Sequence, residues 1–271
     1  MLLAVAAAIL LSVSDPQGDA LGDGGYILPQ GVDAASLDIR SFSAVNRNGK
    51  LELRVNMARL ENPGRAPLGF SGPVLDVFIH SSDTSGVQVL GDTGFSTPPS
   101  LGWQYHLNVN GYQATLRKAA TPESPQTSSD PEGKPPYASA NSPVAASVAD
   151  PLMTSPTPTV HVEGATIVLD TSIPAGPAQY WVFSSLYSPL SANGVQQPSP
   201  VRGPFNLYSA LANAPSPLDV LASGSQARFW RSREVPPVGN EPNRAPYLLI
   251  SGLVGACLAL GATVWSLFAR R

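Results

Sequence analysis

A regular alternation of apolar and polar residues at 50–58 constrains the fold of this chain more than any other feature. Every second side chain from 51 to 57 is leucine, valine or methionine, while those between are charged or amides, as in a strand with one buried face. Asn48 and Gly49 come just before this segment and favour a tight hairpin turn, because both tolerate positive φ. The pattern predicts two paired antiparallel strands, at 37–45 and 50–58.

Four later segments repeat this period of two, and no strong amphipathic helix separates them. The chain of 271 residues holds 28 prolines and 24 glycines, which favours short strands joined by many turns. We therefore expect an all-β fold, an antiparallel β-sandwich. The additional strands are expected at 73–80, 103–112, 165–174 and 179–188.

A proline-rich segment divides these strands into two groups. Residues 119–159 contain nine prolines and hardly any large apolar side chains, so they cannot bury enough surface to offset the entropy cost of ordering. We expect this segment to be a disordered insertion within one domain that spans 15–238. The alternative is that the strand groups before and after it form separate domains.

Apolar segments at both ends of the chain predict export and membrane anchoring. Residues 1–14 have the length of the apolar part of a secretory signal but lack its basic start, so we interpret them as a signal peptide or an N-terminal hydrophobic segment. Residues 247–268 are uncharged, and 22 residues at ~1.5 Å each span a bilayer core of about 30 Å. We predict a single C-terminal transmembrane helix there, preceded by a juxtamembrane linker at 239–246 and followed by a cytoplasmic tail at 269–271. This places the β-domain on the extracytoplasmic face of the cell membrane.

The sequence gives little support to catalysis. It contains no G-x-S-x-G nucleophile elbow, H-E-x-x-H zinc motif, P-loop or dinucleotide fingerprint. Only 13% of its residues are charged and the formal net charge is -3, so nothing attracts it to nucleic acid. We predict that the protein is not an enzyme and acts as a binding or scaffolding module without a nucleic-acid partner.

The stretch DPQGDALGDGGYILP at 15–29 places Asp15, Asp19 and Asp23 four residues apart among glycines that make a helix unfavourable. A loop of this kind can fold its carboxylate and carbonyl oxygens around one hard cation, the coordination that Ca²⁺ prefers. We therefore name these three aspartates as candidate ligands of a structural Ca²⁺. The alternative is a glycine-rich turn whose aspartates cap backbone N–H groups.

Five blocks of sequence, in order, resemble the DOMON-like C-terminal domain of glucodextranase. The resemblance implies a jelly-roll type β-sandwich with the character of a carbohydrate-binding module, found also in membrane-anchored prokaryotic surface proteins. It also implies a single domain, because the blocks run from about Asp15 to Pro237 on both sides of the proline-rich segment. The blocks are DPQGDALGDGGYILP, SLDIRSFSAV, ARLENPGRAPLGFSGPVLDVFIH, GWQYHLNVNGY and SPLDVLASGSQ.

Two departures from the family pattern bear on the expected sites. The tryptophan that follows Asn-Pro in the family is replaced by Gly64, and the paired acids of the opening motif are reduced to Asp19 and Ala20. If these acids bind a metal in the family, one ligand is missing here. The glycosidase barrel of glucodextranase has no counterpart in this chain, so the resemblance implies no hydrolytic activity.

The function implied is a membrane-anchored extracellular carbohydrate-binding module whose partner is a polysaccharide or a cell-envelope glycan. Sugar sites use flat aromatic rings with neighbouring polar groups, and strand aromatics serve equally well as sandwich core. The alternative is a structural or protein-interaction module of the cell envelope that makes a surface-layer type of contact. The sequence leaves the oligomeric state open. The candidate ligand-binding aromatics are Trp103, Tyr105, Tyr112, Trp181 and Tyr187.

Overall fold

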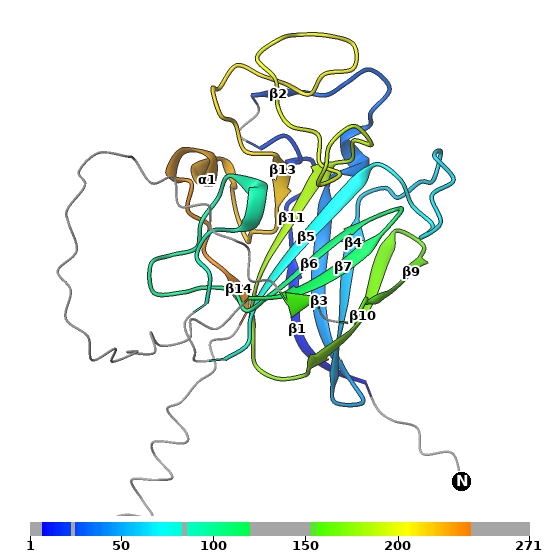
Figure 1. The fold of residues 1–271 in the computed structure, drawn as a ribbon, viewed down its shortest axis with the longest axis vertical. Helices are drawn as coiled ribbons and strands as arrows, with labels where there is room; N and C mark the ends of the chain where they lie inside the picture. Colours follow the sequence, from blue (N-terminus) through cyan, green and yellow to red (C-terminus); the bar gives the residue numbers. More distant parts are fainter. Residues whose placement is uncertain (1–6, 23–24, 83–85, 120–152, 155, 240–271) are drawn as a thin grey trace, which may run out of the picture.

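The computed structural model describes residues 7–22, 25–82, 86–119, 153–154 and 156–239. Strands make up most of its regular structure, and every ladder between named strands is antiparallel (Figure 1). The predicted all-β, antiparallel fold is confirmed. The helical elements in these ranges are α1 (Ala227–Ser232) and the 3₁₀ turns η1 (Ala34–Ser36) and η2 (Gly91–Thr93).

The first sheet contains five strands in the order β1-β3-β4-β10-β9. Its β3–β4 hairpin is the one predicted from the Asn-Gly pair, because Asn48 and Gly49 take φ values of 56° and 80° between the paired residues Arg47 and Lys50. Its strands are β1 (Ala8–Ser14), β3 (Ile39–Arg47), β4 (Lys50–Met57), β10 (Thr166–Pro174) and β9 (Thr159–Glu163).

Strand β1 lies in the segment predicted as a signal peptide or hydrophobic segment. It pairs with β3 from Ala8 opposite Asn46 to Ser14 opposite Ser41. Leu11 and other apolar side chains of β1 pack against the core between the sheets. The sheet therefore starts seven residues before the predicted domain boundary at 15, because a short apolar run suits an edge strand as well as the apolar part of a signal.

The second sheet follows the order β13-β11-β5-β6-β7-β8, with β14 also paired to β11, and a two-stranded ladder joins β2 to β12. Its central strands, β5 and β11, pair over eight positions. The strands are β13 (Pro217–Val220), β11 (Gln179–Leu186), β5 (Pro73–His80), β6 (Tyr105–Asn110), β7 (Ala114–Lys118), β8 (Met153–Thr154), β14 (Val238–Gly239), β2 (Tyr26–Ile27) and β12 (Tyr208–Ser209).

Strands that precede and strands that follow the proline-rich segment lie side by side in each sheet. β10 pairs with β4 in the first sheet, and β11 pairs with β5 in the second. The two strand groups are therefore parts of one sandwich. Residues 120–152 of the predicted disordered insertion lie outside the described residues, but β8, also predicted to belong to the insertion, pairs with β7.

The centre of the second sheet is buried on both faces, unlike the sheets of a simple two-layer sandwich. Its inner face meets the first sheet in a core where Phe42 contacts Tyr180 with ring centroids 5.0 Å apart. Its outer face carries Phe78, Trp181 and Phe183, which pack in a second cluster under loops and α1 (Figure 1). Every residue of β5 and β11 is consequently buried, so these strands lack the alternation of buried and exposed positions that is expected of a half-buried strand.

No helix within the described ranges is long and apolar enough to cross a membrane. The predicted transmembrane helix at 247–268 and the tail at 269–271 lie outside those ranges. Of the predicted linker at 239–246 only Gly239 is described, and it belongs to β14.

Candidate functional site

Two of the five aromatic residues predicted to bind ligand lie in the outer core. Trp103 is 4% exposed and Trp181 is 1% exposed. Their indole Nε1 groups donate hydrogen bonds at 2.8 Å to the carbonyl oxygens of Val89 and Val235. The rings are therefore enclosed and their polar atoms satisfied, so neither presents a face to solvent in this structure.

Tyr105 and Tyr112 lie at opposite ends of β6, so they do not share a surface. Tyr105 is the first residue of the strand, is half-buried, and has the ammonium of Lys118 5.9 Å from its ring centroid. Tyr112 follows the last residue of the strand and is 44% exposed. Of these two tyrosines, Tyr112 is therefore the exposed one.

Tyr112 and Tyr187 form a stacked pair at one end of the second sheet. Their ring centroids are 5.0 Å apart and the ring planes are inclined by 27°. The sheet register explains why the two rings meet. The last residues of β6 and of β11 both pair with the first residues of β5, so the segments that follow these two strands lie close together. The structure thus brings together two of the predicted aromatics from positions 75 residues apart in the sequence.

The backbone of both tyrosines is held by hydrogen bonds. Tyr112 N donates to Oδ1 of Asn110 at 2.8 Å, and the same oxygen accepts from Gln113 N at 3.0 Å. Tyr187 N donates to the carbonyl oxygen of Gly72 at 2.8 Å. Because Asn110 is buried, the turn that carries Tyr112 is fixed by the core.

A glycine stands beside each tyrosine ring. A Cβ atom at Gly64 would lie 2.9 Å from the hydroxyl oxygen of Tyr112, and one at Gly194 would lie 3.6 Å from Cε2 of Tyr187. Gly64, where the resemblance described above led us to expect tryptophan, therefore adjoins the tyrosine pair.

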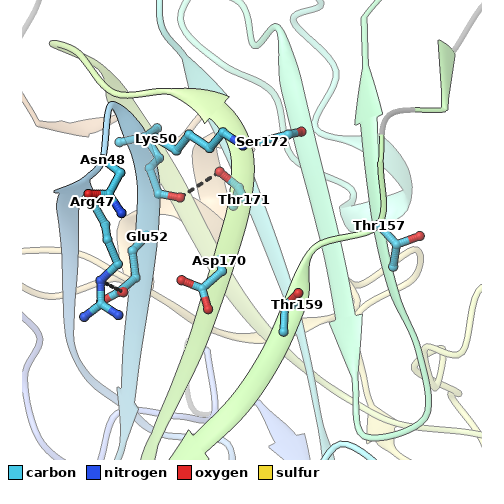
Figure 2. A pocket seen from close by; sticks show the side chains of 10 residues that line it. Arg47, Asn48, Lys50, Glu52, Thr157, Thr159, Asp170, Thr171 and Ser172 are labelled. Carbon is cyan, nitrogen blue, oxygen red and sulfur yellow. Dashed lines mark hydrogen bonds and ion pairs between the residues drawn. The ribbon is translucent and has the colours of Figure 1, made fainter.

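A separate polar hollow of about 570 Å³ lies where the β3–β4 hairpin meets β10 (Figure 2). Glu52 is buried at its side and forms ion pairs with Arg47 (Nε–Oε2, 2.7 Å) and Arg54 (Nη1–Oε1, 3.0 Å). No aromatic residue lines the hollow, and the sequence analysis did not identify it. Its lining residues are Arg47, Asn48, Lys50, Leu51, Glu52, Thr157, Thr159, Asp170, Thr171 and Ser172.

The acidic loop meets a distant aspartate. Asp15, Asp19 and Asp219 each offer a carboxylate oxygen, and these oxygens lie within 4.8 Å of one another. Asp23, the third predicted ligand, lies outside the described residues. Asp219 lies in β13 and was not among the predicted metal ligands, because only the tertiary structure brings it beside the loop.

Burial dominates the electrostatics of this cluster. Desolvation, with a smaller contribution from neighbouring carboxylates, raises the pKa of Asp15 to about 8 and that of Asp219 to about 7. Hydrogen bonds from Ala222 N to Asp15 and from Ile39 N to Asp219, both 2.6 Å, oppose this rise. The ionised carboxylates are thus unfavourable at neutral pH unless something positive accompanies them.

A model of the C-terminal, SLH-like binding module of glucodextranase matches residues 10–163 of the chain, more than half of its length. The match includes the acidic loop and Tyr112 and ends at the last residue of β9, before Tyr187 and Asp219. No curated protein matches the chain. The strands that follow residue 163 nevertheless complete both sheets.

Proposed function

The chain belongs to the family of C-terminal, SLH-like binding modules of glucodextranase, and from this we propose that it is a non-catalytic carbohydrate-binding module whose sugar contact is the Tyr112–Tyr187 pair. A binding-module family supports a binding role rather than catalysis. The partner is a polysaccharide or cell-envelope glycan.

The stacked tyrosine pair, in which Tyr112 is exposed and Tyr187 is half-buried, is the observation that carries this proposal. Tyr112 is 44% exposed while its ring lies against Tyr187, so its free surface faces away from its partner. A flat aromatic face of this kind suits the apolar face of a pyranose ring, and hydroxyl groups nearby can orient the sugar. The buried Asn110 fixes the turn before binding, which lowers the entropy cost of association.

Glycan binding by the full-length chain tests the proposal. We expect retention on at least one member of a panel of α-glucans and cell-wall polysaccharides. Tyr112→Ala and Tyr187→Ala should each weaken that binding by at least about tenfold, which corresponds to about 1.4 kcal/mol. Affinity electrophoresis in gels that contain each polysaccharide measures the change.

Two matched substitutions locate the contact. Tyr105→Ala removes a half-buried tyrosine at the other end of β6 and should leave binding unchanged. Lys50→Ala alters the polar hollow and should also leave glycan binding unchanged. Weaker binding by this variant would indicate that the sugar binds at the hollow instead of at the tyrosine pair. Retention on none of the polysaccharides would contradict the proposal.

We further propose that the module is displayed on the extracytoplasmic face of the cell membrane by a C-terminal helix at 247–268. The support is the uncharged run of 22 residues in the sequence. Protease treatment of intact cells should remove the β-domain, while the C-terminal residues should stay in the membrane fraction after alkaline extraction. Recovery of the whole chain in the extract would contradict this setting.

A second candidate function is protein contact within the cell envelope. It is favoured by large apolar side chains that project from the loop between β11 and β12, of which Phe205 is 79% exposed. Such side chains are typical of protein interfaces when they gather on one surface. A partner captured from envelope extract by the full-length chain, but not by Phe205→Ser, and retained in the presence of competing sugar would favour this function.

A further inference from the structure

Four aspartates gather where the N-terminal loop meets β13, and their negative charge is poorly balanced. Asp15, Asp19 and Asp38 come from the segment between β1 and β3, and Asp219 comes from β13. Among the described residues, the basic side chain that forms an ion pair with any of them is Arg40, whose Nη1 lies 4.0 Å from Oδ2 of Asp38. The remaining three carboxylates have no such partner in this part of the chain.

Several of the carboxylate oxygens are buried without a hydrogen-bond partner in the described residues. Asp15 is 6% exposed, and while its Oδ1 accepts from Ala222 N at 2.6 Å, its Oδ2 accepts nothing. Oδ1 of Asp19 and Oδ1 of Asp38 are buried and unpartnered in the same way. Buried polar atoms normally have partners, because leaving a carboxylate oxygen without one is costly. These oxygens therefore point to a ligand.

The spacing of the oxygens suits a hard cation. One oxygen from each of Asp15, Asp19 and Asp219 lies within 4.8 Å of the others. Two oxygens that bind one Ca²⁺ ion, each at 2.3–2.6 Å, can be at most about 4.6–5.2 Å apart, so this spacing is compatible with a single ion, and a site made of oxygens alone is what Ca²⁺ prefers. We propose that Asp15, Asp19 and Asp219 bind one Ca²⁺ ion in a buried site that joins the N-terminal loop to β13.

The surrounding hydrogen bonds hold these ligands in place. Gln226 donates from Nε2 to Oδ1 of Asp219 at 2.9 Å and also to the carbonyl oxygen of Asp19, while its Oε1 accepts from Val220 N at 2.9 Å. Gly18 N donates to Oδ2 of Asp38 at 3.0 Å, so Asp38 shapes the loop next to the ion. Partners that orient the ligands in this way are usual around metal sites.

The site lies beneath the layer that covers the outer core. Gly22 N donates to the carbonyl oxygen of Leu218 at 2.8 Å, and Gly22 packs against the ring of Trp230. Loss of the ion should therefore loosen the loop and α1 before it affects the core between the sheets. Trp230 provides a fluorescence probe for this change, because it lies in α1 beside the loop.

Calcium binding by the full-length chain, stripped with chelator and then titrated, tests the proposal. We expect one Ca²⁺ per chain by equilibrium dialysis, a rise in Tm on addition of Ca²⁺, and a change in tryptophan emission. Asp15→Asn and Asp219→Asn should each lower the affinity by at least about tenfold, because affinity depends on the number of charged ligands. Asp92→Asn removes an exposed carboxylate outside the cluster and should leave the affinity unchanged.

Asp19→Asn covers the case in which the buried substitutions prevent folding. Gln226 donates a hydrogen bond to the main-chain carbonyl oxygen of Asp19, so this substitution removes a ligand charge and leaves the acceptor of that bond in place. It should also lower the Ca²⁺ affinity. No binding at millimolar Ca²⁺, binding that all three substitutions leave unchanged, or Mg²⁺ binding as tight as Ca²⁺ binding would overturn the proposal. None of these outcomes depends on whether the tyrosine pair binds sugar.

Discussion

At the scale of single residues, a close backbone contact and the side chain of Asn110 together fix the tyrosine site. Asn110 ends β6, Gly111 and Tyr112 belong to the turn between β6 and β7, and Gly111 lies tightly against the loop before β5. A Cβ atom at Gly111 would lie 1.9 Å from the carbonyl oxygen of Phe70. The sequence showed Tyr112 as a candidate, but the requirement for glycine beside it is visible only in the packed structure.

Gly111→Ala should therefore destabilise the protein by about 1–3 kcal/mol, because the backbone must shift to admit the methyl group. Gly176→Ala is the matched control, since a Cβ there would meet no atom within 4 Å and Gly176 does not have positive φ. Denaturant unfolding of both variants measures the difference. An equal free energy of unfolding for the two variants would show that the turn shifts to admit the methyl group without loss of stability.

Asn110→Ala should cost about 1–3 kcal/mol as well, because it leaves the N–H groups of Tyr112 and Gln113 without their acceptor. Asn110→Asp keeps an acceptor at that position and should lose less when both variants are measured at acidic pH, where the buried carboxyl group is neutral. Thermal unfolding of the two variants compares them. A smaller loss for alanine than for aspartate would mean that water replaces the missing oxygen.

At the scale of secondary structure elements, the alternation of apolar and polar residues predicted where strands lie, but it did not predict which faces of those strands are buried. Alternation predicted β3 and β4, and the Asn-Gly pair predicted their turn. The same reasoning could not show that β5 and β11 are buried on both faces, because that depends on loops that fold over the sheet. Trp181 is a core residue for this reason.

The sequence of β1 is compatible with two different structures. A run of seven residues, mostly apolar, fits both an edge strand and the apolar part of a signal, and length alone does not separate them. If β1 belongs to the mature protein, Val13→Asp should lower Tm, because Val13 packs against the core. Ser12→Asp on the exposed face should change Tm little.

Mass spectrometry of the mature N-terminus is the companion measurement for β1. A terminus at or before Ala8, together with the difference between the two variants, would agree with the strand. A mature chain that starts at Asp15, with Tm equal to that of the uncleaved protein, would contradict the contribution of β1 to stability.

At the scale of the whole molecule, the family match and the folded domain differ in extent. The match ends at residue 163, but β10 lies between β4 and β9, and β11 lies between β5 and β13. Two of the strands beyond the match, β10 and β11, therefore lie inside the sheets rather than at their edges. Pairing between strands far apart in the chain cannot be predicted from the pattern of neighbouring residues. The proximity of Asp15 and Asp219 could not be predicted from the sequence for the same reason.

A chain that ends at residue 163 should consequently fail to fold. It would lack Ile167, Leu169, Tyr180 and Val182, all buried between the sheets. A chain that ends at residue 239 keeps every strand described and should unfold cooperatively. Near-ultraviolet circular dichroism during thermal unfolding compares the two. A cooperative transition in the shorter chain would show that the matched region is an autonomous unit.

The pairing of β14 with β11 gives the domain a polarity. Gly239, where the described chain ends, lies opposite Gln179 at the first residue of β11, and Tyr187 comes just after the last. Eight residues at about 3.3 Å each separate the two ends of this strand by roughly 25 Å. Tyr112 and Tyr187 therefore lie at the opposite end of this strand from Gly239, so a ligand bound to the tyrosines would not contact the residues that follow the described domain directly.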